Sequence, residues 1–328
     1  MNRRRVLRFA FGIGVASRAL PLWAQNAVVG MRRVGVLAPS TRAKEEVTLK
    51  AFFDEMRRLG RIEGQTIAYD RTYADDRHQD LPRLAAELVA HNPELIYAPP
   101  QIAAIAARQA TRTIPIVFAT GINPVGAGLV SSLARPGGNV TGILSVIDSL
   151  APKRLELLRE ILPGAKRIGL LGDFADPRLT NDRTALAPVA SALGLTIVVR
   201  GASNPVEFDA AVAGLIEQRV DAILAVTSIS SNLRERLSEL TLPRRVPVVG
   251  SLRAVAEVGG LLTYAASVPD QLRRSAQLVD KVLRGAKPAD LAVEQPSRFE
   301  LVLNLKTART LGLSIPQSLL QRSDEVIP

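Results

Sequence analysis

The sequence predicts an α/β protein of two Rossmann-like lobes, each with a parallel sheet flanked by helices. From Arg33 onward, short β-branched runs alternate with helix-length stretches whose apolar residues recur with a period of 3.6. Three strand-like segments then recur later in the chain in the same order. The 328 residues, 47% hydrophobic and 22% charged, also suit about two globular domains of roughly 150 residues each.

The first lobe is expected to begin with a strand from Arg33 to Ala38, followed by a helix that Gly60 ends. The apolar face of this helix is predicted to consist of Val47, Phe52, Phe53, Met56 and Leu59. Further strands are expected at 66–71, 95–98 and 115–119, and helices at 81–90 and 102–111.

The second lobe is predicted from the internal repeat. The segments 166–171, 221–225 and 246–249 resemble 32–37, 94–98 and 114–117, respectively, at a nearly constant offset of about 130 residues. The turn Pro136–Asn139 and the segment Asp148–Lys153 are expected to mark the first crossover between lobes. The predicted division is an N-terminal lobe of 31–146 plus about 273–305, and a C-terminal lobe of 147–272 plus about 306–328.

Candidate ligand contacts are the polar loops after the strands, because ligands of open parallel sheets bind outside the carboxyl ends of the strands. Two facing lobes would form a cleft between two such edges. Turn formation and helix capping are the alternative roles of these residues, since Ser, Thr and Asn serve both whether or not a ligand binds. The predicted contacts are Ser40, Thr41, Pro99, Gln101, Thr120 and Asn123 in the first lobe, and Asp173, Thr227, Ser228 and Ser251 in the second.

Catalytic motifs are missing from the sequence. Lys306-Thr307 has no glycines around it to form a phosphate-binding loop, and Gly35 stands alone after the first strand. Gly121, Gly126 and Gly128 have the wrong spacing for a dinucleotide site and instead predict a loop with positive φ and close backbone approach. With no cysteine and two histidines, the sequence predicts no disulfide, metal site, cofactor or catalytic residue.

The N-terminus has the form of an export signal. Basic residues precede an apolar run of about nine residues, from Phe9 to Ser17, which is too short to cross a bilayer, where about 20 residues are needed. Arg3-Arg4 favours the twin-arginine route over the general secretory one, and cleavage is expected near Ala24, so that residues 1–24 are removed. The route of export remains open between these two.

The net charge of +11 does not indicate a nucleic-acid partner. A substantial part of it lies in the export signal, and the other basic residues generally have acids nearby. Aromatic residues make up only 4% of the chain, too few for base-stacking platforms.

Several segments resemble ABC transporter substrate-binding proteins of the broad proteobacterial type I class, a group related to binding proteins for aromatic amino acids. The resemblance extends from about Arg33 to the end of the chain. Two departures are Ala265, in place of the usual glycine after Tyr264, and Asn123, at a position that is often Asp. The similar segments are 123–130, 132–135, 136–142, 279–291, Glu294-Gln295-Pro296, 299–308, 311–316 and 322–327.

This resemblance implies a type I periplasmic binding protein with hinge-connected lobes that close on a small molecule, such as an amino acid, and present it to an ABC permease in the inner membrane. It also implies that Tyr264 lies in the cleft wall. The protein is expected to be non-enzymatic and free in the periplasm, with membrane contact only through the permease. Alternatives are a periplasmic ligand sensor for a membrane receptor or kinase, a cytoplasmic ligand-binding regulator, and, least favoured, a degraded enzyme.

Overall fold

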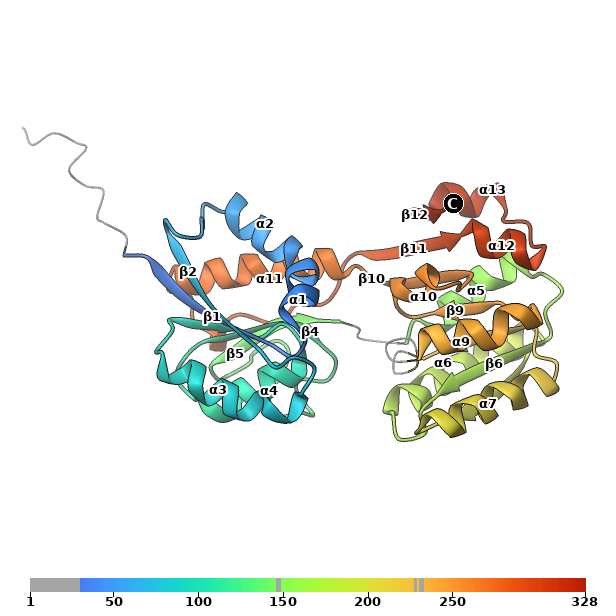
Figure 1. Cartoon of the computed structure of the whole chain (residues 1–328), viewed down its shortest axis with the longest axis horizontal. Coiled ribbons are helices and arrows are strands. Elements are labelled where there is room, and N and C mark those ends of the chain that lie inside the picture. The colour runs from blue at the N-terminus through green and yellow to red at the C-terminus, as the bar shows by residue number, and fades with distance from the viewer. Residues whose placement is uncertain (1–29, 146–148, 227–228, 230–232) are drawn as a thin grey trace, which may run out of the picture.

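The computed structural model describes residues 30–145, 149–226, 229 and 233–328, and it places them around two separate sheets (Figure 1). The first sheet has the order β2-β1-β3-β4-β5 and is parallel throughout. Its strands are β1 (Arg32–Ala38), β2 (Ile67–Tyr73), β3 (Leu95–Tyr97), β4 (Ile116–Gly121) and β5 (Val140–Leu144).

The second sheet has the order β12-β11-β10-β9-β8-β6-β7. Read from β7 to β10, this order repeats that of the first sheet, with β6, β8 and β9 in the places of β1, β3 and β4. The internal repeat is therefore confirmed as a repeat of topology. The strands are β6 (Arg167–Gly172), β7 (Thr196–Gly201), β8 (Ala222–Ala225), β9 (Val248–Gly250), β10 (Leu262–Ala266), β11 (Phe299–Asn304) and β12 (Glu325–Ile327).

Helices cover both faces of the first sheet (Figure 1). Successive side chains of a strand point to opposite faces, so Ile96 packs beneath α3 and α4 while Leu95 and Tyr97 pack beneath α2 and α11. On the second face, Tyr97 stacks on Phe52 with ring centroids 3.8 Å apart. The helices are α1 (Arg42–Thr48), α2 (Lys50–Arg58), α3 (Leu81–Ala90), α4 (Gln101–Ala110) and α11 (Val268–Leu283), with 3-10 turns at His78–Asp80 and Pro288–Asp290.

The second sheet is covered in the same way. One core joins it to α5, α6, α12 and α13, and the other joins it to α7, α9 and α10. Within the described residues, no helix is both long and apolar enough to span a membrane. The helices are α5 (Ala151–Ile161), α6 (Pro177–Ala192), α7 (Pro205–Glu217), α9 (Arg234–Thr241), α10 (Arg253–Glu257), α12 (Leu305–Leu311) and α13 (Gln317–Arg322), with a 3-10 turn at Leu242–Arg244.

The helix expected before Gly60 is divided into α1 and α2 at Leu49. Because of this break, the residues of α1 do not continue the buried face of α2. Phe52 and Met56 of α2 are buried as predicted, but Val47 of α1 is 77% exposed. The prediction of Val47 as a core residue was wrong because it assumed one continuous helical period.

The sheets divide the chain differently from the predicted lobes at the C-terminal crossover. Residues 273–305 were assigned to the first lobe, but β11 pairs antiparallel with β10 in the second sheet. The helix α11 does pack on the first sheet, and it begins at Val268, before the predicted boundary. The repeat covers only the parallel strands, so it gave no information on the antiparallel strand β11, which lies between β10 and the edge strand β12.

The turn Pro136–Asn139 is not at the crossover. It precedes β5 and lies at the amino-terminal edge of the first sheet, where the Asn139 carbonyl accepts a hydrogen bond from the Ile116 amide. The chain leaves the first lobe only after β5, between Ser145 and Leu150, and part of this connection, including Asp148, lies outside the described residues.

Candidate ligand-binding site

The topology turns the carboxyl-terminal edges of the two sheets toward each other. The chain passes from the carboxyl end of β5 to α5 of the second lobe, and from the carboxyl end of β10 to α11 of the first (Figure 1). Because β1–β5 are mutually parallel, as are β6–β10, the other strands of each group end at the same edges. Ligands of open parallel sheets bind at this edge.

A cavity of about 70 Å³ lies at this junction and takes its walls from both lobes. Ile122 and Ser145 follow β4 and β5 of the first sheet, while Ser251 follows β9 of the second. Two arginines from α5 and α6 add positive charge to walls that are otherwise mostly apolar. The lining residues are Ile122, Ser145, Leu150, Arg154, Arg178, Ser251, Leu252, Ala265, Ala266 and Val268.

Arg154 is the most deeply buried cation of this cavity, with 6% of its surface exposed. Its Nε donates a hydrogen bond of 2.9 Å to the carbonyl oxygen of Tyr264 in β10. Burial lowers the pKa of Arg154 to about 10, and the carboxylate of Asp182 partly opposes this shift. The guanidinium therefore stays charged at neutral pH inside a poorly solvated wall.

Asp182 of α6 lies near Arg154, but the charged atoms of the two side chains are too far apart to form an ion pair. Burial raises the pKa of Asp182, while a hydrogen bond of 2.6 Å donated by the Ser149 hydroxyl lowers it in part. Arg178, also on α6, is less buried, and its Nε contacts both carboxylate oxygens of Asp176 at 2.8 and 3.0 Å. Of the two cations of the cavity, Arg178 is thus paired with a carboxylate and Arg154 is not.

In the first lobe, the predicted contacts after β3 and β4 form one hydrogen-bonded group. Gln101 begins α4, and its Oε1 accepts hydrogen bonds from the amides of Ile122 and Asn123 at 2.8 and 3.0 Å. The carbonyl of Pro99 accepts a bond from the Thr120 amide. These contacts hold the loop after β4 in place, so that Ile122 can line the cavity.

Asn123 is exposed, and its Oδ1 accepts a hydrogen bond of 2.9 Å from the Gly126 amide. A Cβ at Gly126 would lie 2.3 Å from Asn123 Nδ2, and Gly128 has a φ of +67°. The prediction of a positive φ is therefore confirmed for Gly128, and that of a close approach for Gly126, where the neighbour is a side chain; Gly121 is the last residue of β4 and has no positive φ.

The predicted contacts after β1 serve the helix that follows. The Ser40 hydroxyl donates a hydrogen bond of 2.6 Å to Asp76, and the Ser40 amide donates to Glu45. Thr41 is the N-cap residue of α1, although its side chain makes no capping hydrogen bond. Both residues stand at the carboxyl edge of the first sheet, but neither lines the small cavity.

In the second lobe, Asp173 follows β6, and its Oδ1 accepts hydrogen bonds from the Ala175 amide and the Ser203 hydroxyl. Ser251 is buried and lines the cavity. Tyr264 is partly buried against the core that joins the sheet to α5 and α6, its ring stacks on Phe299, and its carbonyl accepts the hydrogen bond from Arg154. Thr227 and Ser228 lie outside the described residues.

The two arginines were missed in the sequence because the search followed strand-end loops. Arg154 has a signal of its own: it lies on the same face of α5 as Ala151, Leu158 and Ile161, all of which are buried. A charged residue on the apolar face of an amphipathic helix is an exception that indicates a buried polar contact.

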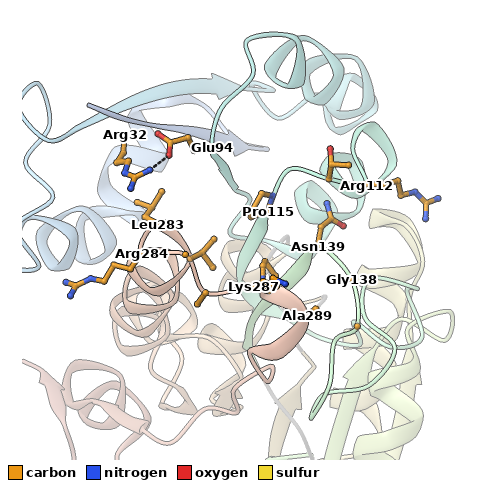
Figure 2. A pocket seen from close by; sticks show the side chains of 16 residues that line it. Arg32, Glu94, Arg112, Pro115, Gly138, Asn139, Leu283, Arg284, Lys287 and Ala289 are labelled. Atoms are coloured by element: carbon orange, nitrogen blue, oxygen red, sulfur yellow. Dashed lines mark hydrogen bonds and ion pairs between the residues drawn. The ribbon is translucent and has the colours of Figure 1, made fainter. Parts of the chain in front are cut away.

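A larger hollow of about 640 Å³ lies at the opposite, amino-terminal edge of the first sheet. Figure 2 shows that Arg112 and Arg284 extend away from it and that Arg32 is paired with Glu94. Asn139 supports its floor by donating from Nδ2 to the carbonyls of Thr111 and Ile114 at 3.2 and 2.7 Å. Its lining comes from the first lobe alone, so this hollow cannot hold a ligand between lobes.

The cavity between the lobes offers binding chemistry. Among the described residues, no cluster of His, Cys, Asp and Glu could hold a metal ion. Its walls can instead desolvate a small solute, donate hydrogen bonds and balance a negative charge, and they would do so better when the lobes approach each other.

Comparisons with known proteins agree with this geometry. The family model of ABC transporter substrate binding proteins matches residues 34–327. A tyrosine-binding protein of Clostridioides difficile (strain R20291) is 26% identical over 265 residues, which cover 80% of this chain and 76% of that protein.

Two solved structures are also similar. A protein from Streptococcus pneumonia in complex with L-Trp has a TM-score of 0.78 and 28% identity, covering 91% of this chain and 100% of that one. A conserved domain protein from Vibrio cholerae has a TM-score of 0.77 and 27% identity, covering 90% and 100%.

Proposed function

The chain belongs to the ABC transporter substrate-binding protein family, and we propose that it captures an amino acid or a similar small metabolite in the periplasm and delivers it to an ABC permease of the inner membrane. Its role as a solute-binding protein follows from the family. The ligand class, the compartment and the permease partner are the parts that we propose.

The observation that supports this proposal most strongly is the arrangement of the two carboxyl edges. Both crossovers described above leave from these edges, and a cavity lined by both lobes lies between them. A solute bound there contacts loops of both lobes at once, so binding favours the closed arrangement by the difference in affinity between the two states. A permease that recognises the closed surface then receives only loaded protein.

Two further observations support the ligand class and the compartment. The tyrosine-binding relative and the L-Trp complex both bind aromatic amino acids, as their names state, at 26% and 28% identity to this chain. The basic and apolar N-terminus has the form of an export signal, although residues 1–29 lie outside the described structure. Capture of a solute in the periplasm requires no catalytic group, and we propose that the protein has no enzymatic activity.

The test is a thermal-shift screen of residues 25–328 against the common L-amino acids, aromatic and aliphatic carboxylates, amines, sugars and polyols. A solute that binds only the folded state stabilises it by mass action and so raises the midpoint of unfolding. At a concentration 100 times its Kd, the solute adds roughly 2.7 kcal/mol to the free energy of unfolding. We expect at least one amino acid or related metabolite to do so. Failure of every class to shift the midpoint would contradict the proposed function.

A further inference from the structure

We propose that Arg154 and Arg178 form an anion site at the base of the cleft, which holds the carboxylate of the ligand, so that the substrates are carboxylates with an apolar body. This inference rests on the proposed function and specifies which chemical group is recognised and which residues recognise it. Neither arginine is among the contacts predicted from the sequence.

The first observation is the incomplete pairing of Arg154. It is 6% exposed, and the only hydrogen bond of its side chain among the described residues runs from Nε to a carbonyl. No carboxylate of the described chain lies within 4 Å of it, because Asp182 interacts with it only at longer range and accepts a bond from Ser149 instead. A buried guanidinium is costly without an anionic partner, and a ligand carboxylate would provide one.

The second observation is the position of Arg178 on the same cavity. Its Nε is engaged by Asp176, which orients the guanidinium and leaves the Nη groups without a partner among the described contacts. The two arginines come from neighbouring helices, α5 and α6, and both line the cavity. Arginine suits this task because its planar fork can donate two parallel hydrogen bonds to one carboxylate.

The third observation is the nature of the remaining walls. Apart from Ser145 and Ser251, the other lining residues are apolar. A cavity of about 70 Å³ is small beside the pockets of roughly 300–1,000 Å³ that enclose whole small molecules, and it suits a carboxylate group.

The body of the ligand must therefore extend out of the cavity into the space between the lobes. Large apolar side chains are exposed at the carboxyl edges of both sheets. Ile122 is 48% and Val125 44% exposed in the loop after β4, and Phe174 is 69% exposed after β6. Closure of the lobes on an apolar ligand body would bury such side chains, which is favourable.

The test uses carboxylates paired with analogues that lack the carboxylate. The probes are L-tryptophan with tryptamine, L-tyrosine with tyramine, L-phenylalanine with 2-phenylethylamine, L-leucine with 3-methylbutylamine, and 3-phenylpropanoate with 3-phenylpropanol. Dissociation constants are measured by calorimetry for the wild type and for Arg178→Gln, Arg154→Lys and Arg183→Gln. Arg183 is exposed on the same helix as Arg178 and is the matched control for the loss of one positive charge.

We expect at least one carboxylate to bind the wild type and its partner to bind at least tenfold more weakly. Arg178→Gln should raise the dissociation constant of that carboxylate roughly 10- to 100-fold, the effect of losing a hydrogen bond to a charged group, and Arg183→Gln should leave it within about twofold. Arg154→Lys retains the charge without the planar fork and should also weaken binding. If Arg154→Lys does not fold, the dissociation constant of Arg178→Gln alone tests the anion site.

Three results would overturn the inference: no carboxylate binds, the partner without the carboxylate binds as tightly, or Arg178→Gln binds like the control. These results are distinguishable from a failure of the proposed function. If a sugar, polyol or amine stabilises the protein while no carboxylate binds, the anion site is wrong and the solute-binding role stands. If no solute of any class binds, both fail.

Discussion

Single residues explain the structural role of one segment with a recognisable sequence, the Pro-Gly-Gly-Asn turn. Asn139 ends the Pro-Gly-Gly-Asn turn, is 8% exposed and ties two loops together through its side-chain amide. Gly137 in the same turn has a φ of +73°, a conformation that favours glycine. The turn therefore builds the amino-terminal edge of the first sheet, opposite the edge at which the candidate ligand-binding cavity lies.

Gly142 of β5 offers a test of packing at the strand that leads out of the first lobe. A Cβ there would lie 2.3 Å from the backbone oxygen of Phe118 and 2.5 Å from its side chain. We expect Gly142→Ala to lower the free energy of unfolding by about 1–3 kcal/mol, since β4 and β5 must separate. Gly164→Ala is the control because its Cβ would meet nothing within 4 Å. Equal stability of the two variants in urea unfolding would contradict the packing.

Asn123 remains a predicted ligand contact. If its exposed side chain bonds a buried ligand after closure, Asn123→Ala should weaken binding by about 1–3 kcal/mol, measured by calorimetry with the tightest-binding solute of the screen. Asn123→Asp keeps an oxygen acceptor for Gly126 and separates loss of the loop contact from loss of the amide donor. Unchanged affinity in both variants would remove Asn123 from the site.

At the scale of elements, α11 is the segment that returns the chain to the first lobe, and polar contacts fix it there. Asp280 of α11 forms an ion pair with Arg61 at 2.8 Å, with the two side chains only 8% and 14% exposed. Glu55 of α2 accepts two bonds of 2.7 Å from Arg58 and one of 3.0 Å from Gln277 of α11. The apolar contacts of α11 with α2 and the sheet then complete the core.

This contact predicts a pH dependence. The Arg58 guanidinium, with help from Gln277, lowers the pKa of Glu55 from 4.5 to about 2. A carboxyl whose pKa is lower in the folded state stabilises the fold above its unfolded pKa, and this contribution disappears as the pH falls from about 4.5 to about 2. Because Arg58 is 66% exposed and solvent screens the pair, we expect about 1–2 kcal/mol.

The measurement compares the wild type with Glu55→Gln in urea unfolding at pH 7 and at successively lower pH. The variant should be less stable at pH 7, and the difference should shrink toward zero near pH 2. Glu156→Gln, at an exposed position of α5, controls for the loss of one carboxylate. A difference between wild type and Glu55→Gln that stays constant with pH would contradict the assignment.

Much of the element order could be predicted from the sequence because buried parallel strands have a strong local signature. The helix at 81–90 and the strands near 33–38 and 95–98 were placed within one or two residues. Features that depend on tertiary contacts could not be predicted. The break at Leu49 reverses the exposure of Val47, and the sheet that β11 joins is decided by its antiparallel partner β10. The position of Arg154 on the apolar face of α5 could have been noticed in the sequence, but its partner, the Tyr264 carbonyl, comes from a distant segment and could not.

At the scale of the whole molecule, the two sheets with the same strand order explain how one chain can bind by closing. Among the described residues, the chain crosses between the lobes after β5, after β10 and before β11. Each lobe packs around hydrophobic cores of its own. Lobes joined in this way can move as bodies with little disturbance of their packing. The sequence could indicate this organisation through its repeat, but it could not place the cavity, which depends on the relative position of the lobes.

If a small solute closes the two lobes, the distance between them must shorten when the solute binds. The sequence contains no cysteine, so Ala43→Cys on α1 and Val206→Cys on α7, both exposed, can carry two spin labels without background. Pulsed electron paramagnetic resonance then measures their separation with and without each solute that stabilises the protein. Closure predicts a shorter and narrower distance distribution for at least one solute. A distribution unchanged by every stabilising solute would show that the lobes do not close on binding.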